Sequence, residues 1–538
     1  MISISKKNAL LSVYNKTGIV QFARALKKLG WNIYSSGGTA KTLRDAKIPV
    51  IDVSTLSGLP PILGHRVVTL VPQVHGGLLS TEEQIEELKK LEYPWLDLVC
   101  VDLYPLKNEI VRQDATTESV IEKTDIGGPT MIRSGAKGRR IVVVEHADRK
   151  KVIEWLKKGE PDGKNFRTDL AAKAEKIVSE YCLYSARFHS EGTINGIIGK
   201  QFALCTYGEN AWQSPAGLFT SDTTEDPLSL QNFSLVEGST PSYNNYCDMD
   251  RMLQTMTHIA GVLDINHKKI PCIAIGVKHG NSCGVSVADK PQDALQGMIS
   301  GDPLALFGGI IMANFPIRGA EAKILRDWNM PDGKKRILDG VFAPSFNSYA
   351  KKELNRKEGK CRLLENKALA KLDASSLDSA IRFRYVRGGF LKQPNYTYIL
   401  DLKDPELEIV GTKISSAKET ELLIAWAIGS TSNSNTITLV KNKTLIGNGV
   451  GQQDRVGAVN LVVSRARRSG HDIRGAVAYS DSFFPFPDGV QVLIDAGVKA
   501  IITTKGSVND EAVREVCRKA KISLYFLPDK KSRGFFGH

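Results

Sequence analysis

Lys278 and His279 are the neighbouring residues whose types and position most directly suggest chemistry. They follow an apolar run, 273–277, and precede a glycine-containing segment, 280–284. A short apolar run bounded by turn residues is typical of a buried strand that leads into a tight loop. At the mouth of such a strand, a lysine can stabilise developing negative charge and a histidine can move a proton near neutral pH. The pair is a candidate for acid–base catalysis, although a solvated lysine beside a hydrogen-bonded histidine gives the same pattern.

A second candidate site lies near the N-terminus, where a glycine pair stands between an expected strand and an expected helix. The strand covers 31–34, and Gly37 and Gly38 precede a helix that begins near Ala40. Backbone N–H groups at a helix N-terminus converge on anions, so this segment is a candidate phosphate site. A tight turn without a ligand explains the glycines as well, and the pattern alone leaves both interpretations open.

The elements that must position these residues alternate in type over the first 200 residues. The expected strands are 8–14, 31–34, 98–103 and 140–144, and a long helix is expected over 169–190. Alternating strands and helices with glycine-rich crossings predict a parallel α/β domain with ligands at the carboxyl ends of its strands. Because a glycine-rich segment follows the long helix, we place a domain boundary near residue 200, which gives domains 1–200 and 201–538.

The second part of the chain carries different motifs. A helix is expected from about Ser242 to Val262, and the segment 436–447 predicts a hairpin that turns at Asn442 and Lys443. The glycines of 447–453 lack the GxGxxG spacing and the βαβ context of a dinucleotide site. The aromatic and proline residues of 482–489 fit core packing at a helix entrance, or a flat platform for a stacked heteroaromatic ligand.

Composition sets bounds on the class of protein. The chain has 538 residues, 42% of them hydrophobic and 24% charged, and a formal charge of +14. These values are typical of soluble globular proteins, and no apolar run is long enough for a membrane span or a signal peptide, so we expect a cytoplasmic protein. Eight scattered cysteines without a CxxC pair argue against a zinc ribbon or a disulfide framework. Because the basic residues are dispersed, an anionic metabolite is favoured over nucleic acid or a membrane.

Several long segments, in order along nearly the whole chain, resemble one family. They are SVYNKTGI, SSGGTAKTLRDAKIPVIDVS, HGGLLS, DLYP and DIGGPTMIRSGAK in the first part, and YGEN, SYNNYCDMD, KHGNSCGVS, GDPLALFGGI, RGGFLKQ, GNGVGQQDR and SDSFFPFPDG in the second. They are similar to the bifunctional purine biosynthesis enzymes that join AICAR transformylase to IMP cyclohydrolase. The resemblance implies a methylglyoxal-synthase-like first domain, a duplicated cytidine-deaminase-like transformylase region, and a homodimer with active sites at its interface.

The resemblance also implies roles in formyl transfer from the cosubstrate 10-formyltetrahydrofolate to AICAR. His279 is expected to be the base, Lys278 the charge stabiliser and acid, and Asn435 the residue that orients the reacting groups. Arg455 is expected to face an anionic ligand group, and Phe483 and Asp488 to hold the folate ring. Tyr207 and Arg533 are the remaining expected substrate contacts. No bound cofactor and no metal are expected, because the chain lacks the HxE and PCxxC motifs of zinc deaminases.

For the cyclohydrolase, the resemblance implies closure of formyl-AICAR to IMP with loss of water. The expected catalytic residues are Tyr104, Asp125 and Lys137. The residues expected to hold the phosphate are Ser12, Lys16, Gly37, Gly38 and Thr39. Holding both ends of one molecule supplies much of the acceleration through proximity.

The sequence departs from the family pattern mainly around this first site. Val68 stands where the family has a lysine, Val71 where it has a histidine, and Tyr14 where it has a serine. Losing an ammonium and a hydroxyl near a phosphate weakens charge-assisted hydrogen bonding, with Arg66 as the remaining cation. In the second part, Thr206 replaces an arginine that meets the AICAR phosphate, and the C-terminal motif is one residue longer.

Three hypotheses follow from these observations. The leading one is a bifunctional transformylase and cyclohydrolase. The second is a monofunctional transformylase whose first domain is degenerate, structural or nucleotide-sensing. The third is a basic nucleic-acid-binding protein on a retired enzyme scaffold, which steep salt-dependent binding without folate turnover would favour.

Overall fold

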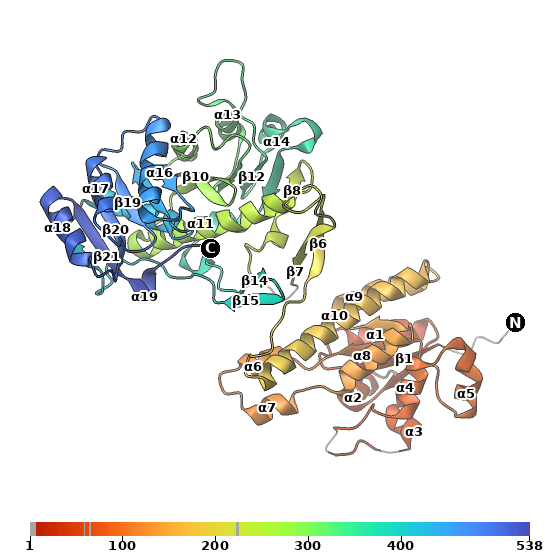
Figure 1. The fold of residues 1–538 in the computed structure, drawn as a ribbon. Helices are drawn as coiled ribbons and strands as arrows, with labels where there is room; N and C mark the ends of the chain where they lie inside the picture. The colour runs from red at the N-terminus through yellow and green to blue at the C-terminus, as the bar shows by residue number, and fades with distance from the viewer. Residues whose placement is uncertain (1–6, 59, 64–65, 222–224, 538) are drawn as a thin grey trace. The chain divides into compact units, whose positions relative to one another are not determined.

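The computed structural model describes residues 7–58, 60–63, 66–221 and 225–537. The chain divides into two compact units, Met1–Ile198 and Gly199–His538. In Figure 1 the first unit runs from red to yellow and the second from yellow through green to blue. The division falls in the segment that follows helix α10 (Gly163–His189).

Unit 1 is built on a five-stranded parallel sheet with the strand order β3-β2-β1-β4-β5. Its strands are β1 (Asn8–Val13), β2 (Asn32–Ser35), β3 (Ile51–Asp52), β4 (Leu98–Asp102) and β5 (Ile141–Val143). The chain proceeds from β1 to one side through β2 and later to the other side through β4. The strand order therefore reverses beside β1, and ligands of open α/β sheets bind at the carboxyl ends of the strands at such a point. The predicted parallel α/β domain is confirmed.

Helices cover both faces of this sheet. Along β1, Leu11 packs with α1 and α9 on one face, whereas Leu10 packs with α4, α8 and α10 on the other, because successive strand residues point to opposite faces. The helices are α1 (Ile19–Lys28), α2 (Gly37–Asp45), α3 (Val53–Ser57), α4 (Pro72–Leu79), α5 (Ile85–Lys90), α6 (Leu106–Val111), α7 (Thr117–Glu122), α8 (Gly127–Lys137), α9 (His146–Lys157) and α10, with the 3-10 turn η1 (Glu82–Gln84). Helix α2 begins at Gly37, earlier than the predicted start near Ala40, because the two glycines form its first turn.

Unit 2 contains a twelve-stranded mixed sheet with the order β16-β21-β20-β19-β17-β18-β10-β9-β11-β12-β13-β8. The order reads outward from the β18–β10 pair as two equivalent halves, β10-β9-β11-β12-β13-β8 and β18-β17-β19-β20-β21-β16. The first half comprises β8 (Ser234–Glu237), β9 (Cys272–Lys278), β10 (Asn281–Ala288), β11 (Ile310–Ala313), β12 (Gly340–Ala343) and β13 (Arg362–Glu365). The second comprises β16 (Glu408–Val410), β17 (Ile437–Lys441), β18 (Thr444–Gly449), β19 (Val477–Ser480), β20 (Ala500–Lys505) and β21 (Ser523–Pro528). Unit 2 is therefore an internal duplication.

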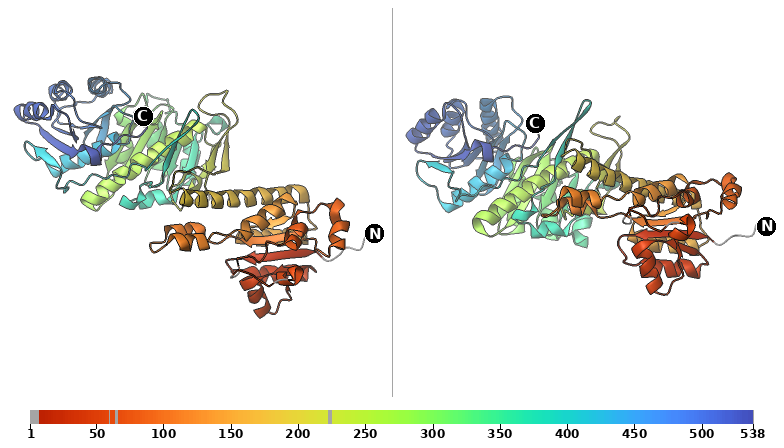
Figure 2. Two further views of the ribbon diagram at one scale, coloured as in Figure 1. Left: turned by 60° about the horizontal axis from the view of Figure 1, so that its bottom comes forward. Right: turned by 90° about the horizontal axis from the view of Figure 1, so that it is seen from below.

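The helices of unit 2 repeat in the same way. One central helix from each half, α11 (Tyr243–His267) and α15 (Ser416–Gly429), packs on a common face of the sheet in one large core. Figure 2 shows α11 lying along this face. The opposite face is covered by α12 (Pro291–Gly301), α13 (Gly319–Asp327) and α14 (Ser348–Leu354) in the first half, and by α16 (Arg455–Arg468), α17 (Asp488–Asp495) and α18 (Asp510–Ala520) in the second. Each half thus supplies its own outer layer, and the two share the inner one.

The remaining elements of unit 2 are short. Two separate hairpins pair β6 (Lys200–Cys205) with β7 (Ala216–Thr220) and β14 (Arg382–Val386) with β15 (Gly389–Gln393). The other short elements are η2 (Leu230–Asn232), η3 (Lys357–Gly359), η4 (Lys367–Lys371), η5 (Ala374–Ser376) and α19 (Asp529–Ser532).

The turn after Lys278 is shorter than predicted. His279 and Gly280 both have positive φ, 54° and 72°, and β10 starts at once at Asn281. Two central residues with positive φ are typical of a type I′ hairpin turn, whose twist matches the flanking strands. The predicted hairpin at Asn442 and Lys443 is confirmed, with φ values of 53° and 58°.

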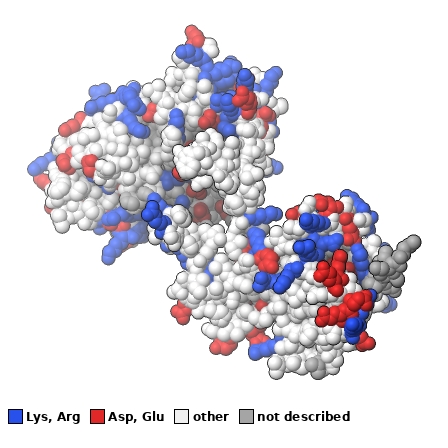
Figure 3. All heavy atoms as spheres, turned by 45° about the vertical axis from the view of Figure 1, so that its right-hand side comes forward, with Lys and Arg blue, Asp and Glu red and all other residues white. Residues whose placement is uncertain are grey.

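Within the described residues, none of the helices is long and apolar enough to cross a membrane. The same residues contain no cluster of three or more His, Cys, Asp or Glu side chains able to hold a metal ion. On the face of the molecule seen in Figure 3, Lys and Arg side chains are interspersed with Asp and Glu in both units.

Candidate functional sites

The first cluster lies at the carboxyl ends of β1 and β2 in unit 1. The Thr39 hydroxyl accepts a hydrogen bond from the Val13 amide and donates one to the Val13 carbonyl, both at 3.0 Å. Lys16 Nζ donates to the carbonyls of Val13 and Tyr14, the latter at 3.2 Å. It also lies beside Gly38, since a Cβ at that glycine would be 3.8 Å from it. The structure thus brings Lys16, Gly38 and Thr39 together around the end of β1, where Ser12 is the penultimate residue.

Two residues that the sequence interpretation missed hold this loop in place. Asp102, the last residue of β4, accepts hydrogen bonds from the backbone amides of Tyr14 and Asn15, the latter at 3.2 Å. The buried Arg149 lies 3.5 Å from Asp102 and donates to the Thr17 carbonyl at 2.6 Å. Burial raises the pKa of Asp102 and lowers the pKa of Lys16. A carboxylate at the end of a parallel strand was the one signal in the sequence that could have identified Asp102.

Tyr104 and Asp125 lie next to each other, because the Tyr104 amide donates a hydrogen bond to the Asp125 carboxylate. The ring of Tyr104 packs edge-on against Tyr14, with centroids 5.3 Å apart. Asp125 accepts a hydrogen bond from the Gly128 amide at 2.8 Å, and burial raises its pKa. Burial also raises the pKa of Tyr104, and the charge of Asp125 adds to this effect. The pair therefore favours its neutral forms, which suits proton transfer at a pH above the ordinary range of a carboxylate.

The structure does not bring Lys137 to this pair. Asp125 precedes α8, whereas Lys137 is the last residue of that helix and exposed. At 1.5 Å per residue the far end of the helix is about 15 Å from its start. Arg66 is exposed and its guanidinium pairs with Glu122. Glu122 ends helix α7 three residues before Asp125, so Arg66 is held beside the segment that carries Asp125. Lys137 alone lies at the far end of α8.

The substituted position Val71 has a structural role. Val71 is the N-cap residue of α4 and packs against the core that includes Leu10 and Val74. Because this side chain is apolar and partly buried, the valine is accommodated by packing where the family has a histidine.

The second cluster is in unit 2 and starts from the β9–β10 hairpin. Lys278 ends β9, and its Nζ donates to the Phe307 carbonyl at 2.8 Å. His279 is exposed at the turn. The following amide, Gly280 N, donates to Asp248 on α11 at 2.6 Å, and Arg251 Nε donates to the Gly280 carbonyl at 3.0 Å. The central helix therefore fixes the turn that presents Lys278 and His279.

The other half of the unit meets this hairpin through the segment 433–435. The Asn433 amide donates to Asn281 Oδ1 at 3.2 Å, and Arg251 donates to Asn433 Oδ1 at 2.9 Å. Asn435 follows two residues later and is partly buried. The structure thus joins two sequence-distant segments, one carrying the Lys278 and His279 pair and the other carrying Asn435.

Arg455 does not face an open ligand position, which corrects the sequence interpretation. Its side chain is 8% exposed, and its guanidinium pairs with the fully buried Asp481. The second guanidinium nitrogen donates to Asn435 Oδ1 at 2.8 Å. Arg455 is the first residue of helix α16 and is buried. It therefore contacts the segment 433–435 from the interior of the protein.

Two of the residues expected at the folate end, Phe483 and Arg533, contact each other. Arg533 lies over the Phe483 ring, 5.5 Å from its centroid, and makes a bidentate ion pair with Asp529 at 2.9 and 2.5 Å. Asp488 is exposed and accepts from the Gly489 amide at 2.7 Å. Of the neighbouring aromatic residues, Phe484 is buried in the core. The core interpretation is therefore confirmed for Phe484, and the platform interpretation stays a prediction for Phe483.

Tyr207 lies elsewhere, in a cleft at the start of α11. This cleft of about 380 Å³ is lined by residues that include Thr206, Tyr207, Ser242 and Arg362. The sequence interpretation missed Arg362, which provides a guanidinium beside the position where Thr206 replaces the family arginine.

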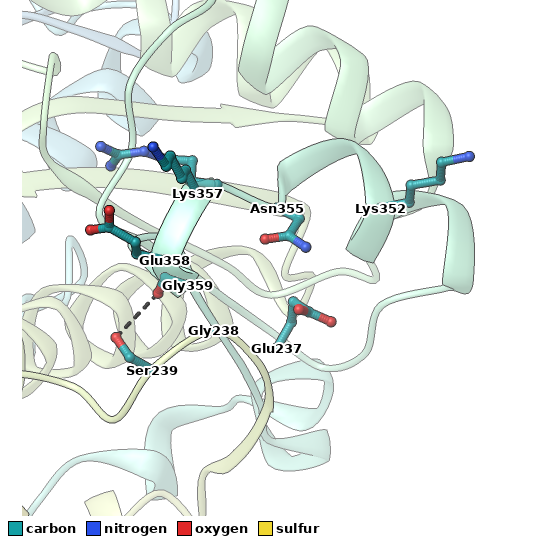
Figure 4. Close-up of a pocket in the computed structure, with 9 residues that line it drawn as sticks. Glu237, Gly238, Ser239, Lys352, Asn355, Lys357, Glu358 and Gly359 are labelled. Atoms are coloured by element: carbon teal, nitrogen blue, oxygen red, sulfur yellow. Dashed lines mark hydrogen bonds between the residues drawn. The ribbon is translucent and has the colours of Figure 1, made fainter.

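A larger cleft of about 710 Å³ opens between the end of β8 and the segment after α14. It is lined by charged residues, and Ser239 donates to the Gly359 carbonyl across it at 3.1 Å (Figure 4). Lys352 of α14 is among the residues that line it (Figure 4). None of the predicted site residues lines it.

The fold and the two clusters give an α/β protein with one candidate site in each unit. A family model described as the AICARFT/IMPCHase bienzyme matches residues 137–465, and a model of MGS-like domains matches residues 18–130. The bifunctional purine biosynthesis protein PurH of Persephonella marina is 33% identical over 534 residues, which are 97% of this chain and 98% of that protein. PurH of Acetivibrio thermocellus is 35% identical with the same coverage. The chain belongs to the AICARFT/IMPCHase bienzyme family.

A match to a solved structure was also found. The protein in the crystal structure of ForH has 32% sequence identity to this chain. The match covers 35% of this chain and 100% of the ForH chain, with a TM-score of 0.32. The family matches confirm the predicted methylglyoxal-synthase-like first domain and the transformylase region that follows it.

Proposed function

We propose that unit 2 transfers the formyl group of 10-formyltetrahydrofolate to AICAR and that unit 1 closes formyl-AICAR to IMP. Family membership supports both activities. The observation that carries the first is the meeting of the Lys278 and His279 hairpin with the Asn435 segment through the hydrogen bond of Asn433 to Asn281. A retired scaffold has no chemical reason to keep these groups together, so the nucleic-acid-binding hypothesis loses its support.

Formyl transfer requires one bond to form and one to break. The 5-amino nitrogen of AICAR attacks the formyl carbon, the new N–C bond forms, and the bond from that carbon to N10 of the folate breaks. His279 takes the proton that leaves the amine, while Lys278 stabilises charge on the formyl oxygen and protonates the departing folate nitrogen. Asn435 orients the reacting groups with a neutral amide.

Ring closure in unit 1 needs less assistance. The carboxamide nitrogen attacks the formyl carbon within one molecule, and the resulting hydroxyl leaves as water. Asp125, whose pKa is raised by burial, carries the proton to that hydroxyl, and Tyr104 orients the carboxamide. Lys16, Gly37, Gly38 and Thr39 hold the phosphate at the end of β1. Lys137 has no role in this step within a single protomer, because it lies at the far end of α8 from Asp125.

A homodimer is part of the proposal. In the β14–β15 hairpin, all of β15 and the last three residues of β14 are exposed in the single chain, with Tyr385 82% and Leu391 60% exposed. Trp212, in the loop after β6, is 82% exposed. Large apolar side chains grouped on exposed hairpins indicate a protein interface. A second copy of the chain is the partner we propose, and a cytoplasmic location stays a prediction of the sequence.

The test is product identification by mass spectrometry after mixing the purified chain with AICAR and 10-formyltetrahydrofolate. IMP that forms faster than formyl-AICAR closes unaided supports both activities. Accumulation of formyl-AICAR favours the monofunctional hypothesis, and no formylation at all contradicts the proposal.

Val68→Lys tests the effect of the first-site substitutions. If the missing ammonium limits ring closure, Val68→Lys raises the cyclohydrolase rate with formyl-AICAR as substrate, by about tenfold for one regained charge-assisted hydrogen bond. An unchanged rate, equal to that of family members with lysine, would show that the substitution is tolerated. Formyl transfer in the same variant is the internal control.

A further inference from the structure

The duplication of unit 2 allows the same position to be compared in two halves of one molecule. Asn314 directly follows β11, and Asp481 directly follows the equivalent strand β19. The Asn314 amide donates to the Ile273 carbonyl at 3.2 Å, and the Asp481 amide donates to the Thr436 carbonyl at 3.3 Å. The two residues therefore occupy equivalent backbone junctions, each beside the start of the first hairpin strand of its half.

In the first half this junction is completed by a neutral side chain. Asn314 Nδ2 donates to the Pro271 carbonyl at 2.9 Å, and its Oδ1 accepts from the Ile273 amide at 2.7 Å. Every group involved is uncharged, and both backbone partners are satisfied. The fold at this position can thus be built without an ion pair.

In the second half the same position holds a buried charge. Asp481 is fully buried, and its carboxylate pairs with Arg455, whose side chain is 8% exposed. Removing two charges from water costs about as much as their attraction returns, so such a pair is weak support for stability. Because Asn314 shows that the fold does not require it, the ion pair calls for another explanation.

The second guanidinium nitrogen of Arg455 supplies that explanation. Arg455 donates to Asn435 Oδ1 at 2.8 Å, and Asn435 Nδ2 donates to the Gln452 carbonyl at 2.9 Å. Rotating the amide by half a turn would set its NH₂ group against a guanidinium and its oxygen against a carbonyl. The two contacts therefore permit only one orientation of the Asn435 amide.

We propose that Asp481 and Arg455 are positioning residues that orient Asn435 for formyl transfer. Arg455 acts through Asn435 and does not contact an anionic group of the substrate, and Asp481 holds Arg455. This inference rests on the proposed function of unit 2. It adds a series of side-chain contacts in which Asp481 holds Arg455 and Arg455 holds Asn435. Displacing a reacting group by about 1 Å can lower a rate about 100-fold.

A cycle of variants tests the inference. Arg455→Gln and Asp481→Asn should each lower kcat for formyl transfer about 100-fold while the KM for AICAR changes less than about twofold. In an Asn435→Ala background, Arg455→Gln should lower kcat no further, because residues that act through one another are not additive. An increase of the AICAR KM by Arg455→Gln in both backgrounds would mean direct substrate contact and would overturn the inference. The control Arg474→Gln removes an exposed arginine paired with Asp472 and should leave kcat unchanged.

The double variant Asp481→Asn with Arg455→Gln separates positioning from folding. Its neutral pair leaves no uncompensated charge, so its Tm should recover relative to either single variant while kcat stays low. Recovery of kcat together with Tm would reduce the pair to a structural role and overturn the inference.

If the wild-type chain forms no formyl-AICAR, the proposed function fails instead. Crystal structures of the wild type and of Asp481→Asn then show whether the Asn435 amide changes its orientation. An unchanged orientation in the variant would overturn the inference.

Discussion

The two halves of unit 2 present the same hairpin with different chemistry. β9 and β17 each end in a lysine, and each lysine donates to a carbonyl in the loop before the next strand of the sheet. Lys278 Nζ contacts the Phe307 carbonyl at 2.8 Å, and Lys441 Nζ contacts the Asp472 carbonyl at 2.9 Å. The central helices also hold both turns, because Asp248 accepts from the amide of the second turn residue, Gly280, at 2.6 Å and Glu421 accepts from the amide of the first turn residue, Asn442, at 3.0 Å.

The two hairpins differ in their first turn residue and in the charged groups near their lysines. Lys441 also has the carboxylate of Asp472 at 3.4 Å, whereas no ion pair of Lys278 is found in the described part of the chain. The turn begins with His279 in the first hairpin and with Asn442 in the second. The comparison teaches that the backbone provides two equivalent turns and that a catalytic site is favoured only where the lysine lacks a counterion and a histidine stands beside it.

The largest effect is expected from making the first turn resemble the second. His279→Asn keeps a residue that tolerates the positive φ of 54° but removes the proton acceptor. We expect formyl transfer to fall about 1,000-fold, within the range for loss of a general base. Steady-state kinetics measure this, and Asn442→His is the reciprocal control. Wild-type turnover in His279→Asn would remove His279 from the mechanism.

A smaller loss of activity is expected from the lysine of the first hairpin. Lys278→Met should lower kcat for formyl transfer about 100-fold, because one donor to the developing negative charge is lost. Lys441→Met deletes the equivalent ammonium of the second hairpin and should leave kcat unchanged. Equal losses in the two variants would show that both lysines act through stability, and the comparison of the hairpins would fail.

The inner core that joins the two halves should lose stability in acid. His258 of α11 is fully buried, stacks on Tyr396 at 5.5 Å and contacts Trp426 of α15, and burial lowers its pKa from 6.5 to about 4. A His pKa that is lower in the folded state gives stability that is present above pH 6.5 and is lost as the pH falls toward 4. The full loss is about 3 kcal/mol.

Urea unfolding at several pH values between 7 and 4 measures this loss. His258→Phe keeps an aromatic ring in the stack and removes the titrating group, so the variant should show a smaller decrease in the free energy of unfolding over the same range. Parallel pH profiles for the two proteins would assign the acid sensitivity to other groups.

The smallest effect concerns the turns themselves. Lys443 has a φ of 58°, whereas the equivalent second turn residue of the first hairpin is Gly280. A residue other than glycine in the left-handed region costs about 1 kcal/mol, so Lys443→Gly should raise the free energy of unfolding by up to about that amount. Denaturant unfolding measures it, with Lys499→Gln, which removes one exposed positive charge, as a charge-matched control. A lower stability would mean that the Lys443 side chain makes a contact worth more than the strain.

Much of the fold could be predicted because the deciding patterns are local. The apolar run before Lys278, the turn residues Asn442 and Lys443, and the strand and helix alternation of unit 1 each depend on residues close in sequence. Local patterns also located the loop that carries Lys16 and the stretch that carries Phe483. The start of β10 was missed because residues other than glycine rarely have positive φ, so a two-residue turn at His279 had no clear local signal.

The sequence by itself determined which chemical groups this protein has and where its strands end, since residue type and periodicity are local properties. Only the tertiary structure decided which groups meet. Asn433 and Asn281 are 152 positions apart, and Arg455 and Asp481 are 26 apart on a helix and a strand end. Arg455 therefore turned out to be an internal partner of Asn435, and Lys137 lies at the far end of α8 from Asp125. Packing fixes such partnerships, because burial and hydrogen bonding select one arrangement among many that the residue types allow.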